Sequence, residues 1–559
     1  MKVNLSLVFF FSLIYLYGQA PQWLVTYGGP GDERAKVITT DSQQNAIIAG
    51  NFEETVDFDP GPNTLDLTSA GNNDAYIQKL DVNGELLWVK RFGGAESIEI
   101  FGIDTDSAGN IFLVGGFKGQ ADFDPSILGF YNLTSLGSWD IYVVKLDAQG
   151  NFIWAKQIGS PDLEYGADVA VDNAGNIYLD GWFKNDMDFD PGAGEDLHTA
   201  KGLNDVFIIK LDTNGQYVWG QQFGGASQET ARGLFVKDNL LFVSGSFSLT
   251  ATYGTATAAP SLTSQGGKDG FLLQLDTAGN YLWGKSFGGS SSDEVREICL
   301  DDQNNIYLTG KVSGNADLDP GSTSFMVSAN AAGNTFVAKL TPNAQFLWAT
   351  LFNGTNTNIG YSLIFHQNHL NLAGYFKDTI SIPQIDNTMH DYISNGDNDA
   401  YIADIDPTSG LTNWFYPFGG TGNEQVYMLS PAGTGQFYAI GRFQSSVNFD
   451  GLQSNSLVTS NGGYDAFVLK IAEQTDDIQP DFFSNIEVYP NPGNGLFKIN
   501  LAHPQKAKIK VWNTKGQLIY NQKTSGNQHI LVQLPKKDGM YLLQIQLQTS
   551  SKFYKLFVN

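Results

Sequence analysis

The chain repeats a short motif in which two aspartates flank one apolar residue and a proline follows. The pairs are Asp57 and Asp59, Asp122 and Asp124, Asp188 and Asp190, and Asp317 and Asp319. Side chains alternate between the two sides of an extended segment, so both carboxylates of a pair face one way and the apolar residue faces the other. Calcium prefers about six to eight oxygen ligands, which two aligned carboxylates, loop carbonyls and a neighbouring glutamate could supply. Calcium binding is therefore one interpretation of these residues.

A turn is the other interpretation of the same motif. Asp59-Pro60-Gly61 suits a type II turn, because Pro60 fixes φ and Gly61 accepts a positive φ. Two further copies of the repeat, at residues 251–255 and 378–383, lack the aspartate pair. The fold therefore does not require the pair, and the turn is the favoured interpretation.

A second set of acids keeps the same repeat. It consists of Glu33, Glu99, Glu164, Glu229, Glu294 and Glu424, each ten or eleven residues after a repeated tryptophan. Their connections and those of the aspartate pairs are expected to open on the same face, which should be acidic. Glycoside hydrolysis needs one pair of carboxylates in distinct environments. The repetition favours a binding surface over a catalytic site.

Asp180 breaks this symmetry. Its equivalents in the other units are Ala49, Val114, Ser244, Thr309, Ala373 and Ile440. A lone carboxylate in such a position must find a partner or shift its pKa, and a structural hydrogen-bonding role is favoured over a functional one. His366 and His369 are expected in a turn rather than a metal site, and the only cysteine, Cys299, in the core. No catalytic triad motif, phosphate-binding glycine loop or basic aromatic patch is recognisable.

Repeated tryptophans define the elements that position these residues. They recur at intervals of 64 to 66 residues, as Trp23, Trp88, Trp154, Trp219, Trp283, Trp348 and Trp414. Each interval predicts four strands in two hairpins, such as residues 101–117, which turn at Gly109. Asn304 replaces the turn glycine of another unit and also tolerates a positive φ. The pattern predicts an all-β, seven-bladed β-propeller with four strands per blade.

The two ends of the repeat predict how the propeller closes. The strand at Trp23 has no partner strand before it, and the strand at residues 465–471 has no tryptophan strand after it. Each end thus carries the strand that the other lacks. We expect the N-terminal and C-terminal strands to pair and complete the last blade, which leaves no open sheet edge.

Charge and hydropathy divide the chain further. The 559 residues carry a formal net charge of −26, of which residues 480–559 contribute +7 (ten Lys, three acids) and the rest −33. This negative charge argues against nucleic acid as a partner. Residues 1–18 are typical of a secretory signal peptide. No other apolar run approaches ~20 residues, so no transmembrane anchor is expected.

The repeated units, from residue 23 to residue 471, resemble SBBP-type β-propeller repeats, which occur in large secreted bacterial proteins. The resemblance lies in the Trp-x-x-x-Phe-Gly-Gly runs, the Asp-x-x-Gly-Asn hairpins and the Asp-Ala-Phe/Tyr strands. It implies a scaffold and carries no catalytic residues with it.

The C-terminal stretch has a different pattern. After a linker at 473–481, residues 482–559 alternate apolar and polar residues between turn signals, which predicts a small β-sandwich. This stretch is similar to the type A C-terminal sorting domain of the type IX secretion system of Bacteroidota. The matching residues are Tyr489, Pro490, Asn491, Pro492, Gly495, Gly516, Gly539, Tyr541 and Lys555. The resemblance implies recognition by the outer-membrane translocon.

These features predict a signal peptide (1–18), a propeller (21–472) and a sorting domain (482–559). We expect export through the periplasm to the cell surface or medium. A non-catalytic binding or scaffold protein, with a glycan or protein ligand on its acidic face, is favoured. The alternative is a secreted hydrolase or lyase with its site on that face. Calcium is the only cofactor that the sequence suggests.

Overall fold

The computed structural model describes residues 20–126, 128–254, 259–449, 457–472, 487–505, 507–515, 517–524, 527–535, 537, 539–547 and 550–558. The expected signal peptide and linker lie outside the described residues. Contacts divide the chain into two compact units, Met1–Gln474 and Thr475–Asn559. Within the described residues, no helix is long and apolar enough to cross a membrane.

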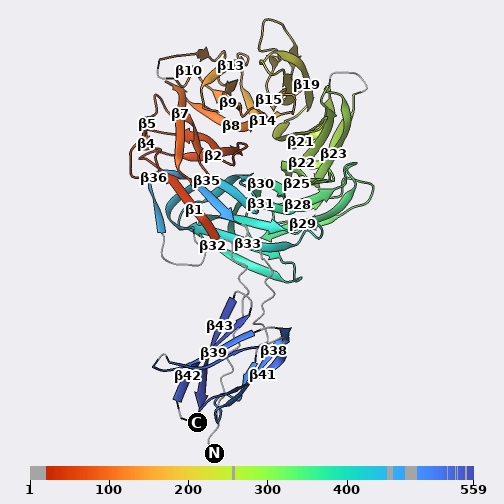
Figure 1. Ribbon diagram of the computed structural model, residues 1–559. Helices are drawn as coiled ribbons and strands as arrows, with labels where there is room; N and C mark the ends of the chain where they lie inside the picture. Colours follow the sequence, from red (N-terminus) through yellow and green to blue (C-terminus); the bar gives the residue numbers. More distant parts are fainter. Residues whose placement is uncertain are drawn as a thin grey trace, which may run out of the picture. The chain divides into compact units, whose positions relative to one another are not determined.

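The first unit is all-β, and its main strands pair in antiparallel groups of four (Figure 1). In pairing order the groups are β2 (Arg34–Thr40), β3 (Ala46–Phe52), β6 (Asp74–Leu80) and β7 (Leu86–Gly94); β8 (Ile98–Thr105), β9 (Ile111–Phe117), β12 (Asp140–Leu146) and β13 (Phe152–Ile158); β14 (Glu164–Val171), β15 (Ile177–Phe183), β18 (Asp205–Leu211) and β19 (Tyr217–Gly225); β20 (Thr230–Lys237), β21 (Leu240–Tyr253), β22 (Ser261–Asp276) and β23 (Tyr281–Gly289); β24 (Glu294–Leu300), β25 (Ile306–Val312), β28 (Asn334–Leu340) and β29 (Phe346–Gly354); β30 (Asn358–His366), β31 (His369–Pro383), β32 (Met389–Ile405) and β33 (Thr412–Gly420); β34 (Gln425–Pro431), β35 (Gln436–Asn448), β36 (Leu457–Ala472) and β1 (Ala20–Tyr27).

Short hairpins extend between the second and third strands of four groups. They are β4 (Thr55–Asp57) with β5 (Asp66–Thr68), β10 (Gln120–Asp122) with β11 (Asn132–Thr134), β16 (Asp186–Asp188) with β17 (Leu197–Thr199), and β26 (Asn315–Asp317) with β27 (Met326–Ser328). The turns that join the main strands use left-handed residues, as the sequence predicts. Gly109 has a φ of +80° and Asn304 a φ of +61°, which confirms both turn assignments.

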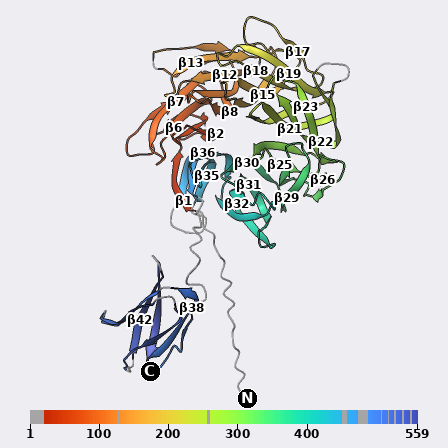
Figure 2. The ribbon, with the colours of Figure 1, turned by 45° about the vertical axis from the view of Figure 1, so that its right-hand side comes forward.

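The first strands of successive groups contact one another at the centre of the unit (Figure 2). The contacts run from β2 through β8, β14, β20, β24 and β30 to β34, and β34 also contacts β2. At the chain's start, β1 pairs with β36, with Tyr27 opposite Ala466 and Ala20 opposite Ala472. The middle strands β3 and β6 are buried along their whole length, because neighbouring sheets cover both of their faces. This burial explains their continuous apolar runs.

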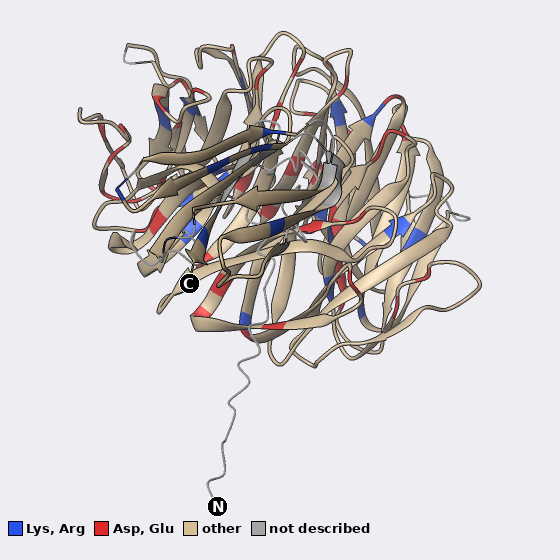
Figure 3. Ribbon diagram, turned by 60° about the horizontal axis from the view of Figure 1, so that its bottom comes forward, with Lys and Arg blue, Asp and Glu red and all other residues tan. Residues whose placement is uncertain are grey.

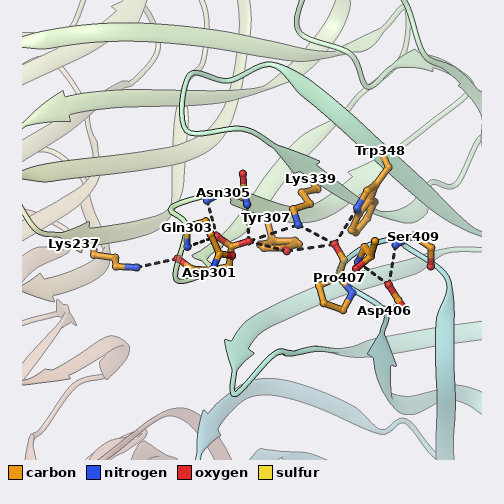
Figure 4. A network of polar contacts seen from close by, with 11 residues as sticks. Lys237, Asp301, Gln303, Asn305, Tyr307, Lys339, Trp348, Asp406, Pro407 and Ser409 are labelled. Carbon is orange, nitrogen blue, oxygen red and sulfur yellow. Dashed lines mark hydrogen bonds and ion pairs between the residues drawn. The ribbon is translucent and has the colours of Figure 1, made fainter.

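A lysine and a tryptophan connect each of several groups to the next one. Lys339 and Trp348 donate hydrogen bonds to the carbonyl oxygen of Pro407, over 3.0 Å from Nζ and 3.3 Å from Nε1 (Figure 4). Lys470 and Trp23 donate in the same way to the carbonyl oxygen of Val82, over 2.9 and 3.0 Å. The tryptophans are therefore structural, as the sequence predicts, and the bond from Trp23 joins the strand at the chain's start to the β6–β7 turn.

The second unit contains two small antiparallel sheets. One consists of β37 (Glu487–Tyr489), β38 (Leu496–Gln505) and β41 (Asn527–Gln533), and the other of β40 (Leu518–Lys523), β39 (Ala507–Asn513), β42 (Gly539–Leu547) and β43 (Ser550–Val558). Both sheets contribute fully buried side chains to one core, including Phe497, Ile509, Val532, Leu543 and Leu556. The alternating apolar residues of this stretch form that shared core.

Candidate functional site

The aspartate pairs lie in turns that their own side chains brace. Oδ1 of Asp57 accepts hydrogen bonds from the backbone N–H of Asp59 (3.0 Å) and Leu65 (2.8 Å), and Oδ1 of Asp59 accepts one from Gly61 (2.7 Å). Phe58 is fully buried, with its ring centroid 4.7 Å from that of Tyr76, so the predicted inward packing is confirmed. The positive φ expected for Gly61 is wrong, because hydrogen bonds that backbone N–H groups donate to the aspartate side chains shape this turn instead.

The other three pairs have the same geometry. The first aspartate of each pair accepts two backbone N–H groups through Oδ1, as Asp57 does; these residues are Asp122, Asp188 and Asp317. The second aspartate accepts one backbone N–H: Asp124 accepts that of Ser126 (3.0 Å), Asp190 that of Gly192 (2.7 Å), and Asp319 that of Gly321 (2.8 Å). All four motifs are therefore turns braced by hydrogen bonds.

The structure does not gather these carboxylates into a metal site. In the part of the chain that the structure describes, no group of three or more His, Cys, Asp or Glu residues is placed to hold a metal ion. The expected calcium ligands instead hold backbone N–H groups of their own turns; they are Asp57, Asp59, Asp122, Asp124, Asp188, Asp190, Asp317 and Asp319. The turn accounts for the motif, and calcium binding stays a prediction.

Most of the repeated glutamates do not lie on an exposed face. Glu33, Glu164, Glu229 and Glu424 are fully buried. Oε2 of Glu33, for example, accepts the backbone N–H of Gly29 over 2.7 Å, and burial raises the pKa of Glu33 to about 8. The expectation that these four carboxylates form an acidic face is wrong, because each braces the turn that precedes its strand.

Two glutamates of the series behave differently. In the group that begins with β24, the buried carboxylate that accepts the N–H of the preceding turn belongs to Asp293 and not to Glu294. Asp293 accepts the N–H of Gly289 over 2.9 Å. Glu294 instead binds Arg296, and Glu99 binds Lys36. Both carboxylates thus take part in ion pairs near the centre of the unit.

A bulge in each first strand turns one residue out of the regular pairing. The bulged residues are Lys36, Phe101, Ala167, Arg232, Arg296, Tyr361 and Tyr427. All of them line one cavity of about 270 Å³ at the centre of the unit, which we call the central cavity. Bulges commonly re-aim side chains at functional sites. The shared position of these residues makes the central cavity the candidate functional site.

Basic side chains form one arc of the central cavity. Nη2 of Arg296 lies 2.6 Å from Oε1 of Glu294, and Nε of Arg232 lies 3.5 Å from Oε2 of the same carboxylate. The single carboxylate of Glu294 therefore pairs with the guanidinium groups of both Arg232 and Arg296, which leaves an excess positive charge. Burial opposes ionisation of Glu294, but the two arginines outweigh it and lower its pKa.

Aromatic rings flank the arginines. The ring of Tyr165 lies 4.2 Å from that of Phe101 and stacks on Trp182 at 5.5 Å, as measured between centroids. On the other side, the centroids of Tyr361 and Tyr427 lie 5.8 Å apart, and the guanidinium of Arg296 lies 4.8 Å from the centroid of Tyr361. The cavity thus presents both cations and apolar ring faces.

The sequence holds a signal for this cavity that its strand pattern did not reveal. Acids outnumber Lys and Arg by 58 to 32 in the whole chain, and the only arginines are Arg34, Arg91, Arg232, Arg296 and Arg442. Figure 3 marks the described acidic segments in red and the basic ones in blue. All of these arginines except Arg91 lie near the central cavity. Arg232 and Arg296 line it, and Arg34 and Arg442 are close enough to Lys36 to lower its pKa, although burial is the main cause of that lowering. A basic aromatic patch therefore exists, but its members come from different repeats.

Buried acids lie beside the central cavity. Asp168 and Glu297 line both it and an adjoining cavity of about 310 Å³. Burial raises the pKa of Asp168 to about 7 and that of Glu297 to about 8. Asp180 is fully buried next to them, and within the described residues neither of its carboxylate oxygens accepts a hydrogen bond. The structural hydrogen-bonding role expected for Asp180 is therefore wrong, and burial raises its pKa well above the usual range.

The remaining singled-out residues of the first unit are structural. Cys299 is 7% exposed and packs in a hydrophobic core, which confirms its assignment. His366 and His369 face each other across the β30–β31 turn, where Nε2 of His366 contacts the carbonyl oxygen of Gly433 at 3.0 Å.

In the second unit, Asn491 fastens the Tyr489–Pro492 segment to the last strand. Its Nδ2 donates to the carbonyl oxygen of Lys555 over 2.7 Å, and its Oδ1 accepts the N–H of Phe557 over 2.9 Å. Tyr541 donates to the carbonyl oxygen of Lys537 over 3.2 Å, and Gly495 and Gly539 have positive φ. Gly516 lies outside the described residues. The two ends of the predicted sorting signal thus meet in space.

Comparison with known proteins identifies the second unit. Residues 487–559 match the family described as the secretion system C-terminal sorting domain. An uncharacterised WD repeat-containing protein of Acanthamoeba polyphaga mimivirus is 26% identical over 230 residues, which cover 36% of this chain and 16% of that protein. The regulatory protein FlaEY of Caulobacter vibrioides is 23% identical over 345 residues, or 58% of this chain and 34% of that protein. The chain spans about a third or less of these relatives.

Two solved structures align with this chain at low sequence identity. A europium-containing methanol dehydrogenase aligns with a TM-score of 0.36 and 9% identity, covering 81% of this chain and 93% of that one. Sqt1 from Chaetomium thermophilum aligns with a TM-score of 0.37 and 12% identity, covering 81% and 100%.

The four-stranded sheets around a common centre make the first unit a propeller-like β domain. The second unit is a sorting domain of the type IX secretion system. The chain is therefore a secreted or surface-attached protein of Bacteroidota.

Proposed function

We propose that the first unit is a closed, seven-bladed β-propeller spanning residues 21–472. Three features support closure: the pairing of β1 with β36, the contact of β34 with β2, and the bonds of Lys470 and Trp23 to Val82. The ~65-residue period supports a kinship of the units with SBBP repeats. A signal peptide at 1–18, a linker at 473–481 and a β-sandwich at 482–559 complete the proposed organisation.

We propose further that this propeller is a non-catalytic binding protein that carries its ligand at the central cavity. The observation that supports this role is the set of bulges that aim one residue from every first strand into that cavity. The cavity combines cations with aromatic surface, a composition that favours binding of an organic ligand. The ligand site proposed here replaces the acidic face that the sequence suggested.

A secreted hydrolase or lyase is the second candidate function. It is favoured by Asp168 and Glu297, two carboxyl groups in the cavity wall whose pKa values burial raises to about 7 and about 8. A carboxyl group that is protonated near neutral pH can act as a general acid.

A glycan array and a hydrolase and lyase screen, both run with the exported protein, separate the two functions. We expect retention of a glycan on the array without turnover of any glycan in the screen. Turnover that is lost in Glu297→Gln would establish the enzyme instead. An array without any bound glycan and a screen without turnover would contradict both.

The export route has its own test. Deletion of residues 482–559 should leave the propeller folded and trapped inside the outer membrane of a native host, because the sorting domain is recognised there. Cell fractionation and immunoblotting measure this distribution. Normal amounts of the truncated protein outside the cell would contradict the proposed role of the tail.

A further inference from the structure

We infer that the central cavity binds a sugar ring carrying a single carboxylate, that is, a uronic acid residue at the end of a glycan chain. This inference rests on the proposed binding function and specifies its ligand. It follows from the order of side chains around the cavity, from the ion pairs of its two arginines and from the net charge of the whole unit.

The order of the first strands places two arginines side by side between aromatic groups. Arg232 on β20 and Arg296 on β24 are neighbours, because β20 contacts β24. The next strand on one side, β30, supplies Tyr361 to the cavity lining, and the next strand on the other side is β14. The bulged residue of β14 is the small Ala167, and the strand beyond it, β8, supplies Phe101 to the cavity lining. A ligand facing the arginines thus meets aromatic rings on both flanks.

Arg232 is the residue best placed to bind an anion. Its side chain is 40% exposed, and its ion pair within the described residues uses Nε, at 3.5 Å from Glu294. Both terminal nitrogens of its guanidinium therefore hold no ion pair there. A guanidinium matches a carboxylate with two parallel hydrogen bonds, which a lysine cannot provide. Arg296, by contrast, is held by a 2.6 Å contact to Glu294 and keeps the site rigid.

The aromatic rings favour a sugar as the bearer of that carboxylate. The C–H face of a pyranose is apolar and packs on aromatic surfaces, which Phe101, Tyr361 and Tyr427 contribute to the cavity lining. The phenol groups of Tyr361 and Tyr427 line the same space and supply partners for sugar hydroxyls. The cavity of about 270 Å³ lies just below the range of roughly 300–1,000 Å³ of drug-sized ligand sites, which suits one ring.

The charge of the unit disfavours a polyanion. The chain outside residues 480–559 carries a net charge of −33, so a polymer with many negative groups is repelled over most of the surface. A ligand with one carboxylate at its end places only that group beside the arginines. A terminal uronic acid on an otherwise neutral glycan meets both conditions.

Isothermal titration of the exported protein with methyl β-D-glucuronide and methyl β-D-glucoside tests the inference. We expect the glucuronide to bind and the glucoside to bind at least tenfold more weakly, and glucuronide affinity to fall as salt is raised. Arg232→Ala should weaken glucuronide binding about tenfold or more. This variant is compatible with the fold, because the equivalent residue of β14 is Ala167.

Arg91→Gln is the matched control. Arg91 does not line the central cavity, and its Nη1 lies 3.0 Å from Oδ2 of Asp74. The equivalent residues Gln157 and Gln222 make the same contact with Asp140 and Asp205 over 2.6 Å. We expect unchanged glucuronide affinity in this variant and equal melting temperatures for both variants.

Equal binding of the two glycosides, tighter binding of a diglutamate peptide, or glucuronide binding unaffected by Arg232→Ala would overturn the inference. Each of these results leaves the proposed binding function standing if the glycan array retains any glycan.

Discussion

Replacing Glu297 with glutamine should make the propeller less sensitive to alkaline pH. Glu297 lies in the wall of the central cavity, and burial, followed by the charge of Asp168, raises its pKa from 4.5 to about 8. In the unfolded chain, this carboxyl group ionises above pH 4.5. Between pH 4.5 and 8 the folded state therefore holds the proton more tightly, and the free energy of unfolding falls as pH rises. Glutamine carries no charge and removes this loss.

The magnitude follows from the width of this window. Between pH 5 and pH 8 the loss is about 1.4 kcal/mol per pH unit, or about 4 kcal/mol in all. This value is an upper limit, because part of the Glu297 side chain reaches the cavity, where solvent screens its charge. With an unfolding entropy of about 2.1 cal/mol/K per residue and roughly 450 residues, 4 kcal/mol corresponds to about 4 °C in melting temperature.

Thermal melts of the exported protein at pH 5 and pH 8, at constant ionic strength, measure the effect. The melting temperature of the wild type should fall by up to about 4 °C more than that of Glu297→Gln. Asp180→Asn should act in the same direction, because burial raises the pKa of Asp180 well above the usual range.

Asp172→Asn serves as the control for these melts. Burial opposes ionisation of Asp172, but hydrogen bonds from Asn176, Tyr178 and Ala174 together outweigh it and lower its pKa. The contribution of Asp172 to stability is therefore lost only below about pH 4. The melting temperature of Asp172→Asn should lie below that of the wild type by the same amount at pH 5 and at pH 8. Equal falls for wild type and Glu297→Gln would refute the argument.

Three further predictions concern the fold and the repeated motif. Removal of residues 20–27 should lower the melting temperature by several degrees, because β36 loses its partner strand; an unchanged melt would exclude the proposed closure. Gly84→Ala should lower it too, because Gly84 has a φ of +86° and an added Cβ would lie 3.0 Å from the ring of Trp23; a wild-type melt would contradict that packing. Melts in millimolar calcium and in chelator should coincide if the aspartate motif is only a turn, whereas a calcium-dependent rise that the double substitution Asp57→Asn and Asp59→Asn abolishes would establish a calcium site.

Much of the fold could be predicted from the sequence, because its period is local and regular. The tryptophans at 65-residue spacing, the turn at Gly109 and its substitute Asn304 each encode a strand or turn without reference to distant residues. The pairing of β1 with β36 could also be anticipated, since the strands missing at the two ends are complementary. The sorting domain was predictable for a different reason, namely a motif that resembles a known family.

The central cavity could not be predicted from this pattern. Its residues occupy bulges, which shift one residue out of the two-residue alternation on which strand assignments rest. Lys36, Arg232 and Tyr361 differ in type, so their equivalence is visible only in the strand register. The prediction of an acidic face was wrong for a related reason. Sequence alone does not distinguish a solvent-exposed glutamate from one such as Glu33, which is buried against a backbone N–H.

A crystal structure of the exported protein grown with methyl β-D-glucuronide tests the central claim most directly. We expect the sugar ring in the central cavity, between Phe101 and Tyr361, with its carboxylate within hydrogen-bonding distance of Arg232. Ligand bound at another face of the propeller, or a central cavity without the sugar in crystals grown at saturating concentration, would contradict the account.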